Sequence, residues 1–240
     1  MVVWLFSGGG ETEVRGLVPF LKRTFPEYTF ERKSPVRRKP GPKPGLATQY
    51  RYGLTGKGFV KEIPKRLRDS LNSNDHCDII LIFDDLDCRD YSRQKENCLN
   101  AVESVKRAAG IKRYIGFAAP EMEAWIIGDW DHSFARHPDF RDRHSAMRHW
   151  LSAKKKISFD APESFGKYDS QRDACDEKMS EAIIESTTLA LGDRFKPRYS
   201  KAKHTPELLL DIKPEEILKR CPLFRDFYHY FNPTHERYDK

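Results

Sequence analysis

The segment from Asp78 to Asp87 constrains the fold most strongly. It places the apolar run Ile79-Ile80-Leu81-Ile82-Phe83 directly before Asp84, Asp85 and Asp87. A short, uninterrupted apolar run rich in β-branched residues is typical of a strand that is buried on both faces of a parallel sheet. Folding alone does not require three acids after such a strand. We therefore expect a central strand that brings carboxylates to the edge of the sheet where ligands collect.

Three further segments predict strands of the same sheet. They are residues 2–6, which end in Ser7 and three glycines, residues 28–32, and residues 114–119 before Pro120. Apolar residues at helical spacing separate them, and this alternation predicts an α/β fold with a mainly parallel sheet flanked by helices. Beyond residue 130 the patterns are helical, and Thr205 is expected to cap one of these helices. The sequence thus predicts an α/β core at residues 1–130 and a mainly helical C-terminal region at residues 131–240 packed on it.

The positive charge is concentrated in one segment. The formal net charge of the chain is +7. Residues 32–57 contain eight basic residues and no acid, so the rest of the chain has a net charge near −1. Their prolines and glycines predict a long loop. A local basic segment favours a polyanionic partner such as nucleic acid, although a solvated charge run explains it equally well. The expected nucleic-acid-binding residues of this basic loop are Arg32, Lys33, Arg37, Arg38, Lys39, Lys43, Arg51 and Lys57.

Cysteine and histidine patterns do not indicate a metal or disulfide framework. The five cysteines are odd in number and form no C-x-x-C pair, so we expect ordinary reduced thiols. The eight histidines contain no H-E-x-x-H motif and are expected at the surface. No apolar run approaches the roughly 20 residues that span a bilayer, and the N-terminal run is too short for a secretion signal. These observations favour a cytoplasmic protein without a membrane partner.

Acids follow three of the predicted strands. If the chain is extended there, Asp85 and Asp87 point to the same side, and their charges repel unless a cation lies between them. Hard oxygen ligands of this kind suit Mg²⁺ or Mn²⁺. The alternative is a hydrated turn in which one aspartate caps the next helix. The predicted metal ligands are Glu11, Glu13, Asp85, Asp87 and Glu123.

Two other motifs bear on chemistry. The segment 196–204 mixes cations with an aromatic residue, which suits Lys201 and Lys203 to phosphate contacts and Tyr199 to stacking on a base; a basic surface turn fits it as well. The triple glycine matches neither a phosphate-binding loop nor a dinucleotide fingerprint. We expect it to turn the chain sharply and to place Glu11 or Glu13 beside the other acids.

Taken together, these motifs resemble the Toprim-like family described as domain of unknown function 4276. The motifs are the glycine-rich acidic turn after the first strand, Asp85-Leu86-Asp87, Pro120 to Trp125, Tyr199-Ser200-Lys201 and Cys221 to Phe224. The resemblance implies a Toprim-like fold in which a glutamate after the first strand and the two D-x-D aspartates hold magnesium for phosphodiester chemistry. It also implies a nuclease of the overcoming-lysogenization-defect type, working with an ABC- or SMC-like ATPase partner in phage defence. This chain departs from that pattern because Ser7 stands where the glutamate is expected.

Three functions fit these expectations. The first is a Mg²⁺- or Mn²⁺-dependent nuclease of DNA or RNA, in which the predicted metal ligands are catalytic together with Lys201, and the basic loop and Lys203 hold the nucleic acid. The second, favoured by Ser7, is a catalytically inactive subunit that binds nucleic acid or an ATPase and regulates it. The third is hydrolysis or transfer of a phosphate ester on a small nucleotide.

Overall fold

The computed structural model of the protein describes residues 1–35, 54–73, 75–188 and 198–233, apart from the side chains of residues 11–14. Its strands are β1 (Val2–Ser7), β2 (Thr29–Ser34), β3 (Ile79–Asp85), β4 (Lys112–Ala118), β5 (Tyr168–Asp169) and β6 (Ala174–Cys175). Its α-helices are α1 (Glu11–Thr24), α2 (Gly56–Leu71), α3 (Tyr91–Glu103), α4 (Glu123–Gly128), α5 (His144–Lys155), α6 (Met179–Ser186), α7 (Lys201–Asp211), α8 (Pro214–Arg220) and α9 (Pro222–Phe231). Two short 3₁₀ helices span Lys106–Ala108 and Pro162–Ser164.

The main sheet has the strand order β2-β1-β3-β4, and neighbouring strands are parallel. The central strand is the one predicted from the apolar run, and every residue of β3 is buried. Leu81 pairs with Leu5 of β1 on one side and with Tyr114 of β4 on the other. The prediction of a parallel sheet with flanking helices and a helical C-terminal part is confirmed.

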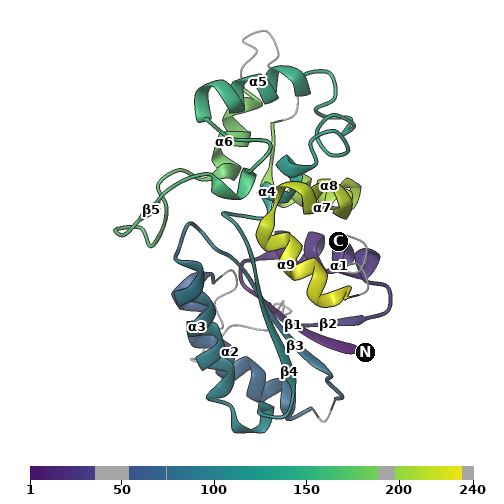
Figure 1. Ribbon diagram of the computed structural model, residues 1–240, viewed down its shortest axis with the longest axis vertical. Helices are drawn as coiled ribbons and strands as arrows, with labels where there is room; N and C mark the ends of the chain where they lie inside the picture. The colour runs from purple at the N-terminus through teal and green to yellow at the C-terminus, as the bar shows by residue number, and fades with distance from the viewer. Residues whose placement is uncertain (36–53, 74, 189–197, 234–240) are drawn as a thin grey trace, which may run out of the picture.

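The sheet is the middle layer of three (Figure 1). Side chains alternate across the sheet, so Val3 and Leu5 face one core and Trp4 and Phe6 face the other. The first core is closed by α1, α4, α7 and α9, and the second by α2 and α3. The C-terminal helices therefore complete the core that the N-terminal half begins. The division at residue 130 stays a prediction.

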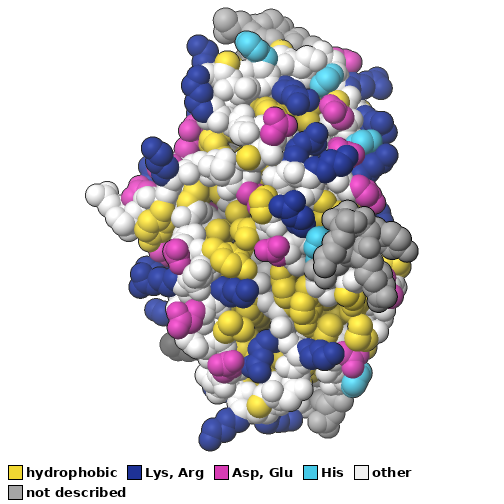
Figure 2. Space-filling view, viewed as in Figure 1, with side chains coloured by type: hydrophobic (Ala, Val, Ile, Leu, Met, Phe, Trp, Pro, Cys, Tyr) yellow, Lys and Arg dark blue, Asp and Glu magenta, His cyan; other side chains and the backbone are white. Residues whose placement is uncertain are grey.

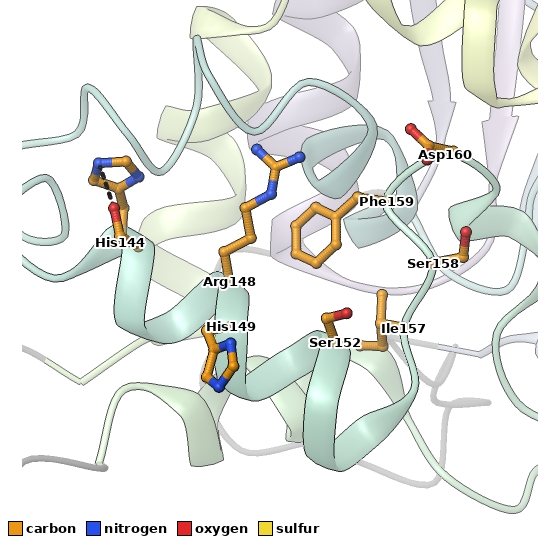
Figure 3. Close-up of a pocket in the computed structure, with 9 residues that line it drawn as sticks. His144, Arg148, His149, Ser152, Ile157, Ser158, Phe159 and Asp160 are labelled. Carbon is orange, nitrogen blue, oxygen red and sulfur yellow. Dashed lines mark hydrogen bonds between the residues drawn. The ribbon is translucent and has the colours of Figure 1, made fainter.

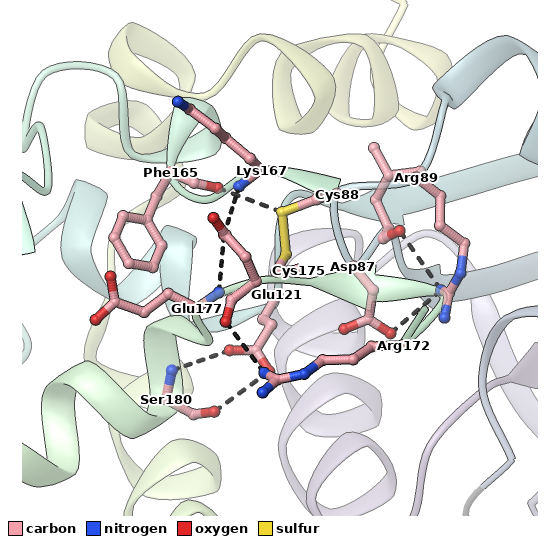
Figure 4. The surroundings of a disulfide bond; sticks show 12 residues. Asp87, Cys88, Arg89, Glu121, Phe165, Lys167, Arg172, Cys175, Glu177 and Ser180 are labelled. Carbon is pink, nitrogen blue, oxygen red and sulfur yellow. Dashed lines mark hydrogen bonds and ion pairs between the residues drawn. A yellow bond between two sulfur atoms is a disulfide. The ribbon is translucent and has the colours of Figure 1, made fainter. Parts of the chain in front are cut away.

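The remaining elements lie beyond the carboxyl ends of the central strands, where α5 and α6 form the upper part of Figure 1. Ser180 of α6 contacts Glu121. The β5–β6 hairpin is joined to the segment after β3 by a disulfide between Cys175 and Cys88 (Figure 4). The expectation that these cysteines are ordinary reduced thiols is therefore wrong. The two residues are 87 positions apart, and only the fold brings them together.

Several expected boundaries also differ from the structure. Both ends of the predicted loop at residues 32–57 belong to regular elements, because β2 continues to Ser34 and α2 begins at Gly56, while residues 36–53 lie outside the described residues. Thr205 does not cap a helix, since α7 begins at Lys201 and places Thr205 in its interior. His137 and His204 are buried rather than exposed. In the parts of the chain that the structure describes, no helix is both long and apolar enough to cross a membrane.

Candidate active site

Three buried carboxylates converge on one cation at the carboxyl ends of β3 and β4. The ammonium nitrogen of Lys201 lies 3.3 Å from Oε2 of Glu123, 3.5 Å from Oδ2 of Asp85 and 3.6 Å from Oε1 of Glu121. The acids come from β3 and from the segment that follows β4, and the lysine opens α7. All three carboxylate side chains are at most 7% exposed, whereas Lys201 is 29% exposed. We call these four residues the carboxylate–lysine cluster.

Glu123 is the most deeply buried member of this cluster. Its Oε1 accepts hydrogen bonds from the hydroxyl groups of Tyr199 at 3.0 Å and Thr205 at 2.8 Å. Its Oε2 is buried and accepts no hydrogen bond from the described residues. The Lys201 ammonium, 3.3 Å away, offsets the negative charge at this oxygen. Burial raises the pKa of Tyr199 well above its ordinary value, so its phenol stays protonated and donates to the carboxylate. Tyr199 is buried, and the expectation that it stacks on a base is wrong.

Glu121 is held from the opposite direction by α6. Its two carboxylate oxygens accept hydrogen bonds from the backbone N–H of Ser180 at 2.9 Å and from its hydroxyl at 3.2 Å (Figure 4). Burial and the neighbouring Glu123 raise the pKa of Glu121, whereas Lys201 and the Ser180 donors oppose this rise. Like charges packed this closely favour uptake of a proton by one of the acids.

Asp85 is fixed by the backbone: its Oδ1 accepts a hydrogen bond from the N–H of Met122 at 3.0 Å, which leaves Oδ2 to face Lys201. Asp84, one residue earlier, points to the other side, where Oδ2 accepts from Gly56 N–H at 2.8 Å. Burial raises the pKa of Asp84 to about 8. A Cβ on Gly8 would lie 2.0 Å from Oδ1 of Asp84. The glycine after β1 therefore makes room for this buried carboxyl group.

Asp87 is directed away from the cluster and toward Arg89. Its carboxylate lies 3.2 Å from the Arg89 guanidinium, and both side chains are 10% exposed. The φ angle of Asp87 is 50°, so the chain after Asp85 is not extended. The premise that Asp85 and Asp87 point to the same side fails for this reason.

A buried histidine sets the start of α7, where Lys201 lies. Nδ1 of His204 accepts a hydrogen bond from the backbone N–H of Ser200 at 2.8 Å, and Nε2 lies 3.1 Å from a carboxylate oxygen of Asp139. A histidine that accepts through one ring nitrogen and faces a carboxylate with the other is fixed in one tautomer. This arrangement orients the first turn of α7 so that Lys201 faces the acids.

The oxygen ligands of the cluster suit Mg²⁺ or Mn²⁺ in chemical type. Three carboxylates already converge on one cationic centre, and the buried Oε2 of Glu123 accepts no hydrogen bond. No group of three or more His, Cys, Asp or Glu side chains among the described residues is arranged closely enough to hold a metal ion as it stands. The residues therefore fit a divalent cation on the condition that the Lys201 ammonium moves aside for it.

Other predicted residues lie elsewhere or outside the described part. Glu11 and Glu13 lie in the first turn of α1, but their side chains are outside the described part of the structure. The predicted residues that lie entirely outside the described part are Arg37, Arg38, Lys39, Lys43 and Arg51. Arg32 is exposed on β2, the edge strand of the sheet. Lys33 lies 3.1 Å from Glu31 and 3.0 Å from Asp75.

Two predicted nucleic-acid contacts lie in ion pairs at the surface. Lys57 lies 3.2 Å from Asp173, and Lys203 lies 2.7 Å from Asp139. In the view of Figure 2, Lys and Arg side chains are spread over the visible face with acidic side chains between them. The described residues on that face therefore form no continuous basic strip.

Among the described residues, cavities also lie outside the cluster, and two of them are large enough for a ligand. One, of about 560 Å³, is bounded by α5 and the segment 157–160, where the guanidinium carbon of Arg148 lies 4.7 Å from the ring centre of Phe159 (Figure 3). The other, of about 340 Å³, lies between the start of α3 and the β5–β6 hairpin.

Sequence reasoning missed one acid of the cluster and the burial of an acid beside it. Glu121 was left out of the predicted ligand set, although it follows β4 in the same way as Glu123. Asp84 was treated as part of an acidic turn, although it is buried within β3. The position of each acid relative to the strand end was the only available signal.

Comparisons with known proteins place the chain in a family. No match was found among curated proteins or among solved structures. A family model described as "Domain of unknown function (DUF4276)" matches residues 10–231, which include the whole carboxylate–lysine cluster. The chain belongs to this family of unknown function.

Proposed function

We propose that this protein is a Mg²⁺- or Mn²⁺-dependent nuclease that hydrolyses phosphodiester bonds of DNA or RNA at the carboxylate–lysine cluster. The observation that supports this proposal is the convergence of Asp85, Glu121 and Glu123 on a single cationic centre. Folding alone gains little from three buried acids around one lysine, because desolvation of charged groups offsets their attraction. Such an arrangement at the carboxyl ends of parallel strands is typical of a ligand site.

Each residue of the cluster has a role in this proposal. The carboxylates of Asp85, Glu121 and Glu123 hold the divalent ion, which when bound supplies a Lewis acid and an activated water. Lys201, partly exposed at the start of α7, turns toward the scissile phosphate and stabilises its developing negative charge. Glu121, whose pKa is raised by burial, holds a proton at its carboxyl group closer to neutral pH than an exposed glutamate does.

The wider biological setting is also part of the proposal. The Toprim relationship, the ABC- or SMC-like ATPase partner, the role in antiviral defence and the cytoplasmic location rest on the resemblance of the motifs. The cluster is compatible with that relationship, because Asp85 belongs to the D-x-D motif and Lys201 to the tyrosine–lysine motif.

A second function is favoured by a specific observation. Lys201 stands where a divalent ion would have to bind, and Ser7 replaces the first-strand glutamate with a hydroxyl group that donates to the adjacent Gly8 carbonyl. A protein in which the lysine permanently neutralises the acids would be a catalytically inactive subunit that binds nucleic acid or an ATPase.

Cleavage and metal binding together test these functions. The first measurement is cleavage of single- and double-stranded DNA and RNA with Mg²⁺, Mn²⁺ or EDTA, by wild type, Asp85→Asn and the exposed control Asp160→Asn. The nuclease proposal expects metal-dependent cleavage that is lost in Asp85→Asn and retained in Asp160→Asn. Calorimetric titration with Mn²⁺ in the absence of nucleic acid should show binding that Asp85→Asn weakens. Absence of both cleavage and Mn²⁺ binding in wild type would overturn the nuclease and favour the inactive subunit, whereas cleavage that persists in EDTA would overturn the metal-dependent mechanism.

A further inference from the structure

The cavity beside the β5–β6 hairpin is lined mainly by polar and charged side chains. Basic and amide side chains from α2, α3 and the β3–α3 segment face the hairpin across about 340 Å³. We call it the hairpin pocket. The lining residues that matter for its chemistry are Lys57, Arg89, Arg93, Gln94, Tyr168 and Asp173.

Arg89 is held rigidly in the wall of this pocket. Its guanidinium lies 3.2 Å from Asp87, and its side chain is 10% exposed. It packs directly over the backbone of Gly56, where a Cβ would lie 2.5 Å from the guanidinium carbon. The absence of a side chain at Gly56 is therefore required for this placement of the arginine. The same disulfide that joins Cys88 to Cys175 anchors the hairpin against the segment that bears Arg89 (Figure 4).

Two nitrogen donors in the pocket wall are buried without a hydrogen-bond acceptor in the described structure. One is the side-chain amide nitrogen of Gln94, a residue that is 4% exposed. The other is Nε of Arg89, which lies 3.6 Å from Oδ2 of Asp173, in an ion pair that is too long for a hydrogen bond. A buried donor left without an acceptor costs about 1–3 kcal/mol. Donors of this kind lining a cavity indicate that an acceptor is supplied from outside the protein.

The carboxylate of Asp173 lies at the rim of the pocket. The carboxylate of Asp173 accepts a hydrogen bond from the Tyr168 hydroxyl at 2.9 Å and lies 3.2 Å from Lys57 and 3.6 Å from Arg89. Asp90, the other acid of the lining, accepts from the backbone N–H of Arg93 and caps α3. The three cations of the lining outnumber these two acids.

We propose that the hairpin pocket binds a phosphate group of the nucleic acid on which the carboxylate–lysine cluster acts, and that this phosphate displaces the carboxylate of Asp173. The inference rests on the proposed function for the identity of the ligand. A phosphate offers the several acceptor oxygens that the unpaired donors and Arg93 require. Arg89 of the pocket lies four residues after Asp85, the member of the cluster that ends β3. A strand held in the pocket would thus be positioned beside the acids.

Binding without catalysis tests this inference. Calorimetry in EDTA would measure the affinity of a single-stranded oligonucleotide with a 5′-phosphate, of the same oligonucleotide with a 5′-hydroxyl, and of a 5′-mononucleotide. Arg93→Ala should weaken binding at least about tenfold, because it removes charge-assisted hydrogen bonds to the phosphate. Asp173→Asn should strengthen it by removing the competing carboxylate. The control Lys112→Ala, which removes an exposed cation from the first residue of β4, should change it less than about twofold.

The three ligands identify which phosphate is bound. Equal affinity for both oligonucleotides supports a backbone phosphate, whereas preference for the phosphorylated oligonucleotide and the mononucleotide supports a terminal one. The inference is overturned if wild type binds none of them, if Arg93→Ala behaves like Lys112→Ala, or if Asp173→Asn weakens binding. Because EDTA excludes cleavage, failure here is distinct from failure of the nuclease assay.

Discussion

Replacing Lys201 with methionine is expected to destabilise the protein strongly near neutral pH and only weakly in mild acid. The ammonium lies within 3.3–3.6 Å of three buried carboxylate oxygens. Methionine retains a long unbranched side chain but removes the charge, so the acids of the cluster would repel one another without compensation. Removing one partner of a buried ion pair costs about 3–5 kcal/mol.

Proton uptake limits this loss. Protonating a glutamate with an ordinary pKa of about 4.3 costs about 1.4 kcal/mol per pH unit above that value, or about 4 kcal/mol near pH 7 and about 1 kcal/mol near pH 5. Burial already raises the pKa of Glu121 in the wild type, so protonating this glutamate in the variant costs less than protonating one with an ordinary pKa. An acid whose folded-state pKa is raised loses stability as the pH rises from its unfolded pKa toward its folded one. We therefore expect a loss of about 3 kcal/mol near pH 8 and less than about 1 kcal/mol near pH 5.

Urea unfolding at the two pH values measures this difference. The matched control is Lys203→Met on the same helix, because Lys203 is 55% exposed and its pair with Asp139 is a surface interaction. That variant should lose less than about 1 kcal/mol at either pH. If the acids can hold a divalent ion, Mg²⁺ should stabilise Lys201→Met more than wild type, by about 2.7 kcal/mol at about a hundredfold excess over the Kd. A loss near pH 8 no larger than that of the control, or one independent of pH, would refute the reasoning.

Three further predictions concern the frame around the cluster. Because burial raises the pKa of Asp84 to about 8, the unfolding free energy of wild type should fall by up to about 4 kcal/mol as the pH rises from about 5 to about 8. Urea unfolding of Asp84→Asn should show a flatter pH dependence, even if this variant is less stable at every pH. Gly8→Ala should lower the unfolding free energy by about 1–3 kcal/mol, since its Cβ would clash with Asp84, whereas Gly110→Ala, with nothing within 4 Å, should change it little. Cys175→Ser should lower it by about 4 kcal/mol under oxidising conditions, because the bond to Cys88 closes a long loop, and a reducing agent should bring wild type to the level of the variant.

The sequence by itself determined the order of elements and the edge of the sheet at which the acids collect. The run Ile79 to Phe83 indicated a strand buried on both faces, because five consecutive apolar residues leave no polar face, and the run is short and rich in isoleucine. Acids directly after such strands meet at the carboxyl edge of a parallel sheet, and Asp85 and Glu123 there both face the Lys201 ammonium.

Only the tertiary structure decided which of these acids share one centre. Two consecutive residues in the left-handed region, Asp87 and Cys88, form the turn in which Asp87 faces Arg89, and spacing along the chain carries no information about those backbone angles. Lys201 lies 78 positions after Glu123, the first residue of α4, and the approach of the two side chains depends on how α7 packs. The disulfide between Cys88 and Cys175 has the same origin, since residues 87 positions apart meet only when the hairpin folds over the end of β3. Local patterns report which side chains are buried and where strands end, whereas contacts between distant segments depend on packing that no local pattern contains.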